Sequence, residues 1–151
     1  MEGIVVGVDD SESSREALRW AVEEGRLRKT PVVAVHAWQP PLLPPTADLG
    51  PMAPQMYDVP GLITEAEKAS QELVERVVRE VAGDDPGVEV RAVEIEGSAA
   101  SVLIEAAEGA ELVVVGSRGL GGFRGLLLGS VGRHVAEHAP CPVVIHRVVK
   151  D

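Results

Sequence analysis

A glycine-rich stretch from Gly116 to Ser130 contains the residues best suited to chemistry in this sequence. Seven of the chain's 16 glycines fall between Gly116 and Gly132, more than one tight turn requires. The stretch follows an apolar, largely β-branched run at 112–115, typical of a buried parallel strand, and leads at Ser130 into a predicted helix. Together these elements expose backbone N–H groups and the positive end of a helix dipole. They predict a site for an anion, and a phosphate group fits it best.

Two familiar phosphate motifs do not fit this stretch. A P-loop requires Gly-Lys-Ser or Gly-Lys-Thr at the helix start, and Leu128-Gly129-Ser130 contains no lysine. The dinucleotide fingerprint follows the first strand of its domain, whereas this stretch begins about 115 residues into the chain. The spacing that does occur is G-x-x-G, nine residues and then Gly-Ser, formed by Gly116, Gly119, Gly129 and Ser130. Gly119 and Gly129 are expected to provide either a positive φ or room for a phosphate to approach the backbone.

Polar side chains near this stretch are further candidates for the site. Asp9 follows the first predicted strand, where it could accept hydrogen bonds from a ligand, help to place a metal, or only cap the next helix. Ser130 is expected to cap its helix and can also serve a phosphate. Arg118 and Arg124 lie in the loop, where they could neutralise phosphate oxygens or simply be exposed.

Several other groups are interpreted as structural. His36 lies in a buried strand without a partner visible in the sequence, so packing is favoured over a ligand role. His134 and His138 are spaced i, i+4 on one helix, but no third ligand at metal spacing accompanies them, and no residue is assigned to a metal. Cys141 is the only cysteine, so it cannot form an internal disulfide, and it is expected to be a buried thiol. The run 126–128, three leucines, is expected to anchor the loop or to contact another subunit.

The composition is that of a single domain of ordinary size. The chain has 151 residues, of which 45% are hydrophobic, so residues 1–151 are interpreted as one domain with one core. The net charge of -10 and the lack of a long basic cluster argue against nucleic acid as a partner. No apolar run approaches about 18 residues and no targeting segment precedes the first strand. A cytoplasmic protein without a membrane partner is therefore expected.

The elements that must position these residues alternate between strands and helices. Strands are expected at residues 3–9, 32–38, 88–96, 112–116 and 143–148. Helices are expected from about 13 to 29, 62 to 82 and 130 to 138, and a short helix that extends to about 107 is expected to be capped by Ser98 or Ser101. The first helix is expected to begin with a capping box of Ser13 and Glu16. Residues 39–61 contain seven of the 11 prolines and predict an irregular excursion.

This alternation predicts an α/β fold, namely an open doubly wound (Rossmann-like) domain with a five-stranded parallel sheet and four helices. Ligands of such sheets bind beyond the carboxyl ends of the strands, at the point where the strand order reverses. Asp9, at the end of the first strand, would then face Val115 and Gly116, at the end of the fourth. These three residues therefore belong to the predicted site.

Nearly the whole chain resembles the universal stress protein family. The resemblance rests on residues 4–11, 35–37, 109–119 and 139–144, and the glycine spacing is similar to the nucleotide-binding signature of the family's ATP-binding branch. The family's fold implies the strand order 3-2-1-4-5. In ATP-binding members, the residues that match Asp9 and Ala37 lie near the adenosine. The residues implied to line the ribose and phosphates are Gly116, Gly119, Gly129, Ser130 and Val131.

The resemblance implies an ATP-binding regulatory protein of the stress response. Nucleotide occupancy would change the conformation of the loop and the surface presented to partners, and ATP would be accompanied by Mg²⁺ or Mn²⁺. A homodimer through the last strand, 143–148, is expected because this strand is apolar and lies at a sheet edge in the implied order. Two alternatives stay open. One is a slow ATPase or phosphotransferase, with Asp9 and Arg118 as the only candidate residues, and the other is a nucleotide-free dimeric scaffold.

Overall fold

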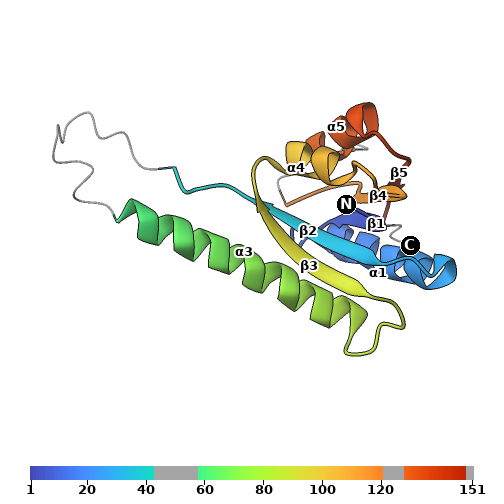
Figure 1. The fold of residues 1–151 in the computed structure, drawn as a ribbon. Coiled ribbons are helices and arrows are strands. Elements are labelled where there is room, and N and C mark those ends of the chain that lie inside the picture. Colours follow the sequence, from blue (N-terminus) through green and yellow to red (C-terminus); the bar gives the residue numbers. More distant parts are fainter. Residues whose placement is uncertain (43–57, 121–127, 149–151) are drawn as a thin grey trace.

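The computed structural model describes residues 1–42, 58–120 and 128–148, which form a parallel sheet with helices on both faces (Figure 1). The five strands pair in the order β3-β2-β1-β4-β5, and every pair is parallel. Their bounds are β1 Ile4–Gly7, β2 Val32–Trp38, β3 Val90–Glu96, β4 Leu112–Gly116 and β5 Val143–His146. The doubly wound fold and the strand order 3-2-1-4-5 are thereby confirmed.

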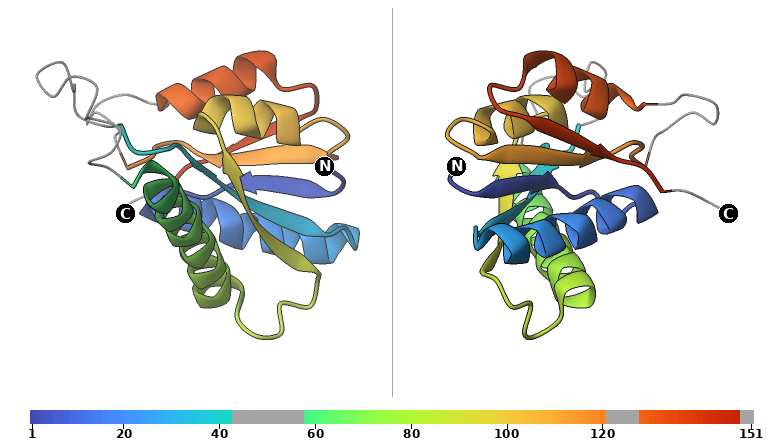
Figure 2. Two further views of the ribbon diagram at one scale, coloured as in Figure 1. Left: turned by 60° about the vertical axis from the view of Figure 1, so that its left-hand side comes forward. Right: turned by 90° about the vertical axis from the view of Figure 1, so that its right-hand side faces the viewer.

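Four helices connect these strands in the described part of the chain. Their bounds are α1 Glu12–Arg28, α3 Val59–Ala82, α4 Ala99–Ala106 and α5 Ser130–His138. Figure 2 shows α1 and α3 on one face of the sheet and α4 and α5 on the other. Because all strands are parallel, their carboxyl ends meet at one edge of the sheet. There β1 and β4 are neighbours, and the strand order reverses between them, because the chain winds outward from β1 to β2 and β3 and then returns to β4.

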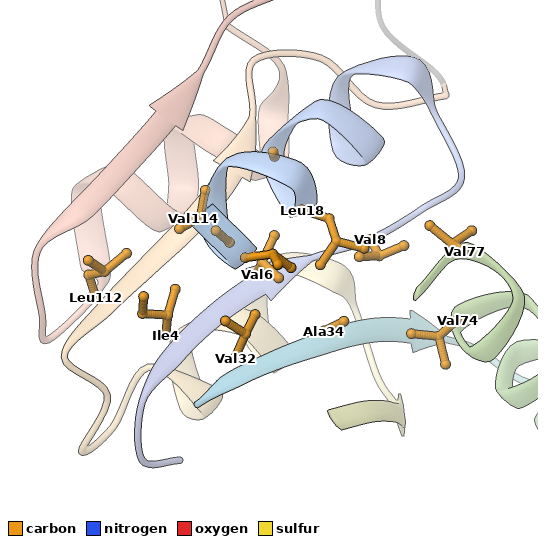
Figure 3. Close-up of a cluster of buried hydrophobic side chains, with 13 residues drawn as sticks. Ile4, Val6, Val8, Leu18, Val32, Ala34, Val74, Val77, Leu112 and Val114 are labelled. Atoms are coloured by element: carbon orange, nitrogen blue, oxygen red, sulfur yellow. The ribbon is translucent and has the colours of Figure 1, made fainter. Parts of the chain in front are cut away.

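Two apolar layers hold the helices against the sheet. Alternate residues of β1 enter different layers: Ile4 and Val6 pack with α1 and α3, whereas Val5 packs with α4 and α5. Figure 3 shows the first layer, in which Val74 and Val77 of α3 approach the sheet. Each of these five side chains is fully buried, and burial of one such side chain contributes about 1.5–3 kcal/mol. The layers fix the central strands, whose carboxyl ends border the candidate site.

Several predicted element ends differ from the observed ones by a few residues. β1 is shorter than the predicted 3–9, and β5 ends at His146 instead of 148. α3 begins three residues earlier than predicted, because Asp58 caps it through the Gly61 N–H at 3.1 Å and a proline is tolerated in the first turn of a helix. The predicted excursion at 39–61 falls largely on 43–57, which lie outside the described residues.

The predicted capping box of α1 is wrong. Ser11 is the N-cap of this helix, and its hydroxyl oxygen accepts the Ser14 N–H at 3.1 Å. Ser13 is instead a buried residue of the first turn, so it does not form a box with Glu16. Three serines within four positions can each cap a helix, and the conformation of a single residue decides among them.

None of the helices in the described ranges is long and apolar enough to cross a membrane.

Candidate functional site

A cavity of about 440 Å³ lies at the carboxyl edge of the sheet, where β1 and β4 end. This volume is within the range of about 300–1,000 Å³ that is usual for small-molecule sites. All nine residues of the predicted site line the cavity: Asp9, Ala37, Val115, Gly116, Arg118, Gly119, Gly129, Ser130 and Val131. The fold thus gathers residues from β2, from β4 and from the segments that follow β1 and β4 around one space.

Helix α5 begins at this cavity, and its N-cap is Gly129, not Ser130 as predicted. The Gly129 carbonyl oxygen accepts the Arg133 N–H at 3.0 Å, so Ser130 is already the first helical residue. No side chain caps α5 among the described residues, whereas α1, α3 and α4 are capped by Ser11, Asp58 and Ser98. The first N–H groups of an α-helix have no partner within the helix. Within the described ranges no hydrogen bond engages the N–H groups of Ser130 and Val131, which lie at the positive end of the α5 dipole.

The two ends of the glycine loop meet at the end of β4. The Ser117 N–H donates to the His146 carbonyl at 2.9 Å, and the Ser117 carbonyl accepts the Gly129 N–H at 2.8 Å. Arg118 lines the cavity, and its backbone N–H donates to Ser13 Oγ at 3.3 Å. The strand end therefore fixes where the loop leaves the sheet and where it returns to α5. The predicted loop residues that lie outside the described ranges are Arg124, Leu126 and Leu127.

The three glycines of the motif are required for different reasons. Neither Gly119 nor Gly129 has a positive φ, so the first explanation given above for a glycine at these positions is wrong. An added Cβ would lie 2.5 Å from Ser13 Oγ at Gly116 and 2.7 Å from Asp9 Oδ2 at Gly119. At Gly129 the nearest atoms would be 3.7 Å away, an ordinary contact. Protein atoms thus explain the first two glycines but leave Gly129 unexplained.

Asp9 connects the turn after β1 with the glycine loop. Its Oδ1 accepts the Ser11 N–H at 3.1 Å and the Ser11 hydroxyl at 2.6 Å. Its Oδ2 accepts the Leu120 N–H at 3.1 Å. Asp9 is not the cap of α1, because Ser11 has that role, so this alternative for Asp9 is wrong. Its role toward a ligand stays a prediction.

Several residues of the cavity wall were not predicted from the sequence. Apolar side chains of Val8, Val35 and Leu103 line it, as do Ser14 and Leu120. Leu103 reaches the wall because β1 ends in a glycine, where a Cβ would lie 2.8 Å from Leu103 Cδ1. The helical spacing of Leu103 predicts only that it faces the sheet. A strictly apolar pattern does not distinguish a filled core from the wall of a cavity.

The groups interpreted as structural lie away from the cavity. His36 Nδ1 is 2.6 Å from Ser70 Oγ of α3, and burial lowers the pKa of His36, in agreement with a packing role. The rings of His134 and His138 are 5.8 Å apart, and no group of three metal-ligating residues occurs in the described part of the chain. Cys141 is half-buried, and burial raises the pKa of its thiol.

Comparisons with known proteins agree on the family. The family model described as the universal stress protein family matches residues 1–147. The chain is 34% identical over 143 residues to a universal stress protein of Mycolicibacterium smegmatis, and the alignment covers 95% of this chain and 47% of that protein. The chain thus spans less than half the length of this curated relative, and the same is true of similar proteins from Mycobacterium tuberculosis.

Solved structures share the fold, and some of them contain nucleotides. A universal stress protein in complex with cAMP has a TM-score of 0.66 and 24% identity, with 96% of each chain covered. A universal stress protein family protein of Arabidopsis thaliana with AMP bound has a TM-score of 0.62 and 19% identity, with 100% of this chain and 94% of that chain covered. At these identities the likeness extends to the fold, and the nucleotides are properties of those proteins.

Proposed function

The chain belongs to the universal stress protein family, and on this premise we propose that it is a stress-response regulatory protein that binds ATP in the cavity between β1 and β4. One observation carries the proposal: α5 opens onto the cavity at a glycine N-cap, and no side chain of the described residues pairs with the N–H donors of its first turn. Such a helix start binds phosphate groups through its N–H donors and its dipole.

The two kinds of wall in the cavity match the two halves of a nucleotide. The phosphate half would lie against the N–H groups of Ser130 and Val131, with the Arg118 guanidinium as a further positive group. The nucleoside half would lie against the apolar side chains of Val8, Val35 and Ala37. Ligand sites commonly combine an apolar wall for a ring system with a few polar groups that fix its orientation.

A divalent cation would reach the site together with the triphosphate. The chain has a net charge of -10, which opposes the approach of a polyanion. Mg²⁺ or Mn²⁺ bound to the phosphate oxygens would offset this repulsion, and such ions are usually held by substrate phosphates and few carboxylates. Asp9 is the carboxylate that lines the cavity, so it is the candidate for a contact with the cation or with the nucleoside hydroxyls.

The same geometry favours regulation over catalysis. Hydrolysis requires a base or a water-orienting group beside the γ-phosphate. Asp9 could serve as one, but its two oxygens already accept hydrogen bonds from Ser11 and Leu120. Neither the sequence nor the described residues provide a Walker lysine for the phosphates. Slow hydrolysis or phosphoryl transfer is therefore the second candidate function.

The test begins with protein purified without added nucleotide. Denaturation followed by mass spectrometry should release ATP, and calorimetry with ATP, ADP, AMP and cAMP should rank the ligands with ATP tightest in the presence of Mg²⁺. A turnover assay then separates regulation from hydrolysis. Tighter binding of AMP or cAMP than of ATP would reassign the ligand, and the absence of both bound nucleotide and binding heat would support the nucleotide-free scaffold.

We also propose a homodimer through β5. Of the strands in the described ranges, only β4 pairs with β5, whose side chains Val143, Val144 and Ile145 are half-buried. At the opposite edge, β3 includes Arg91 and Glu96, which are exposed, and charges on an edge strand discourage pairing. A symmetric pair of β5 strands would satisfy the open backbone groups of both copies. Light scattering at micromolar concentration should give twice the mass of the chain, and a strictly monomeric mass would contradict the proposal.

A further inference from the structure

The Asp9 carboxylate lies close to the backbone of Gly119, a contact within the protein that does not involve a phosphate. The Asp9 carboxylate reaches across from the turn after β1 to the Leu120 N–H, at 3.1 Å, and passes directly over Gly119. A Cβ at Gly119 would lie 2.7 Å from Asp9 Oδ2 and 3.9 Å from Asp9 Cγ. Among the described residues no other atom would come within 4 Å of it. The backbone of Gly119 is not in the left-handed region, so its conformation does not require glycine either.

The segment 117–120 has little other support beyond its first residue. Ser117 is held by two backbone hydrogen bonds, whereas Arg118 has one longer bond, from its N–H to Ser13 Oγ at 3.3 Å. The far side of the segment borders a second, more open hollow of about 650 Å³, which is lined by residues that include Ser13 and Arg147. Ser117 is buried, whereas residues 118–120 are exposed. Among the described residues, the bond from Leu120 to Asp9 is thus the hydrogen bond that ties the end of the segment to the turn after β1.

We propose that Asp9, Gly119 and Leu120 form a latch that holds the segment 117–120 as the wall of the cavity. In this latch Asp9 is a positioning residue: its carboxylate fixes the Leu120 N–H and, through it, the place of Arg118 at the cavity. Gly119 leaves the space that this carboxylate occupies, because a Cβ there would lie 2.7 Å from Asp9 Oδ2. The consequence for nucleotide binding rests on the proposed function, but the latch itself belongs to the ligand-free protein.

A double-mutant cycle in the absence of nucleotide tests the latch. Gly119→Ala should raise the unfolding equilibrium constant about tenfold, because the new Cβ meets Asp9 Oδ2. In the Asp9→Ala background the same substitution should leave the constant unchanged or lower it a few-fold, since alanine restricts the unfolded chain more than glycine does. Gly129→Ala is the matched control, and its cost should be the same in both backgrounds, because its Cβ does not approach Asp9 and the weaker N-cap preference of alanine affects both equally. Equal costs of Gly119→Ala in the two backgrounds would overturn the latch.

Amide hydrogen exchange measures the protection of the Leu120 N–H separately from that of other amides, which a general loss of stability would not distinguish. The Leu120 amide should exchange about tenfold faster in Asp9→Ala than in the wild type, while the Gly129 amide, which donates to Ser117, keeps its protection. Asp9→Asn should restore the protection of Leu120, because an amide oxygen can also accept this bond. An unchanged Leu120 rate in Asp9→Ala would overturn the proposal even if the glycine variants fail to fold.

Nucleotide affinity is measured last on the same variants. If the latch positions the wall, Asp9→Ala should weaken ATP binding and Asp9→Asn should recover part of it. Failure of the wild type to bind ATP would contradict the proposed function and leave the latch standing on the stability cycle and on the Leu120 exchange rate. If the wild type binds ATP but the effects of Asp9→Ala and Gly119→Ala on stability are additive, the latch is contradicted and the proposed function stands.

Discussion

The junctions β1–α1 and β4–α5 lie beside each other at the carboxyl edge of the sheet, and each leads from a central strand into a helix. Their N-caps have nearly the same backbone conformation, with φ -68° and ψ 155° at Ser11 and φ -70° and ψ 167° at Gly129. One junction is closed by its own side chains: Ser11 caps α1, and Asp9 accepts bonds from Ser11 and Leu120. At the other junction, no side chain of the described residues caps the start of α5.

This difference indicates that the residue at one N-cap is chosen for stability and the residue at the other for function. Serine, asparagine or aspartate could occupy the conformation of Gly129 and would stabilise α5. A glycine at this position therefore gives up local stability that the backbone would permit, whereas Ser11 keeps it. Proteins that forgo a stabilising residue commonly do so at functional sites. We infer that the closed junction holds the site together and that the open one receives the ligand.

The largest effect is expected when the open junction is closed by substitution. In Gly129→Asp a carboxylate would accept the first N–H groups of α5 and repel phosphate, and ATP affinity should fall about 100-fold or more. The free energy of unfolding should stay equal or rise by a few tenths of a kcal/mol, because aspartate caps slightly better than glycine. Calorimetry measures the affinity, and urea unfolding measures the stability.

Two further substitutions at Gly129 separate charge from size. Gly129→Asn caps the helix without a charge and should weaken ATP binding less than Gly129→Asp does. Gly129→Ala adds only a Cβ, which has ordinary contacts 3.7 Å away, and should weaken it least. Wild-type affinity in Gly129→Asp would show that α5 does not bind the phosphates.

The sequence sufficed for the fold because its signals are redundant. Four of the strands are short, largely apolar runs, β3 mixes apolar and charged residues, and each of the long helices has an amphipathic stripe. The strict alternation of strands and helices leaves few topologies. The cavity was also within reach, since Asp9 and Gly116 end two strands that must meet at one edge of a doubly wound sheet. The family resemblance, and not the topology, implied Ala37, Gly119, Gly129, Ser130 and Val131. All nine predicted residues line one space, and what they bind stays a proposal.

The parts that sequence reasoning missed depend on single dihedral angles and distances. Ser11 and Ser13 are equally good caps by type, and the order Gly129-Ser130 suggests the serine, yet the residue with extended backbone is the cap in each case. The pattern likewise did not show that Gly119 lies under Asp9, because that contact joins residues far apart in the chain. Dimerisation and a cytoplasmic location stay predictions.

A moderate effect is expected when the closed junction is opened. Ser11→Ala removes the oxygen that accepts the Ser14 N–H and should lower the free energy of unfolding by about 1 kcal/mol. It also removes the hydroxyl that donates to Asp9, so ATP affinity should fall a few-fold, far less than in Gly129→Asp. Ser11→Thr keeps the hydroxyl and serves as the control. If Ser11→Ala abolished binding while Gly129→Asp did not, the roles of the two junctions would be reversed.

The smallest expected effect is a pH dependence in the closed junction. Asp10 accepts hydrogen bonds from Arg76 at 2.9 Å and from Arg15 Nε at 2.8 Å, and these guanidinium groups hold the pKa of Asp10 below its ordinary value of 3.8. A pKa lowered by folding contributes stability above pH 3.8, which is lost as the pH falls through the folded-state value. Asp10→Asn should therefore lower the free energy of unfolding at pH 7, by less than about 1 kcal/mol because exposed ion pairs are weak.

Urea unfolding of wild type and Asp10→Asn at a series of pH values from 7 to 3 checks this expectation. Asparagine tolerates the φ of 64° at this position, so the comparison isolates the charge. The stability difference should be constant down to about pH 4 and should shrink below it. His36, whose pKa is lowered from 6.5 chiefly by burial, also destabilises the folded state on acidification, and Asp10 is one of the carboxylates that favour its protonated form. The comparison is therefore made in a His36→Gln background, where this contribution is absent. A difference that persists unchanged to pH 3 would contradict the role assigned to the ion pairs of Asp10 with Arg15 and Arg76.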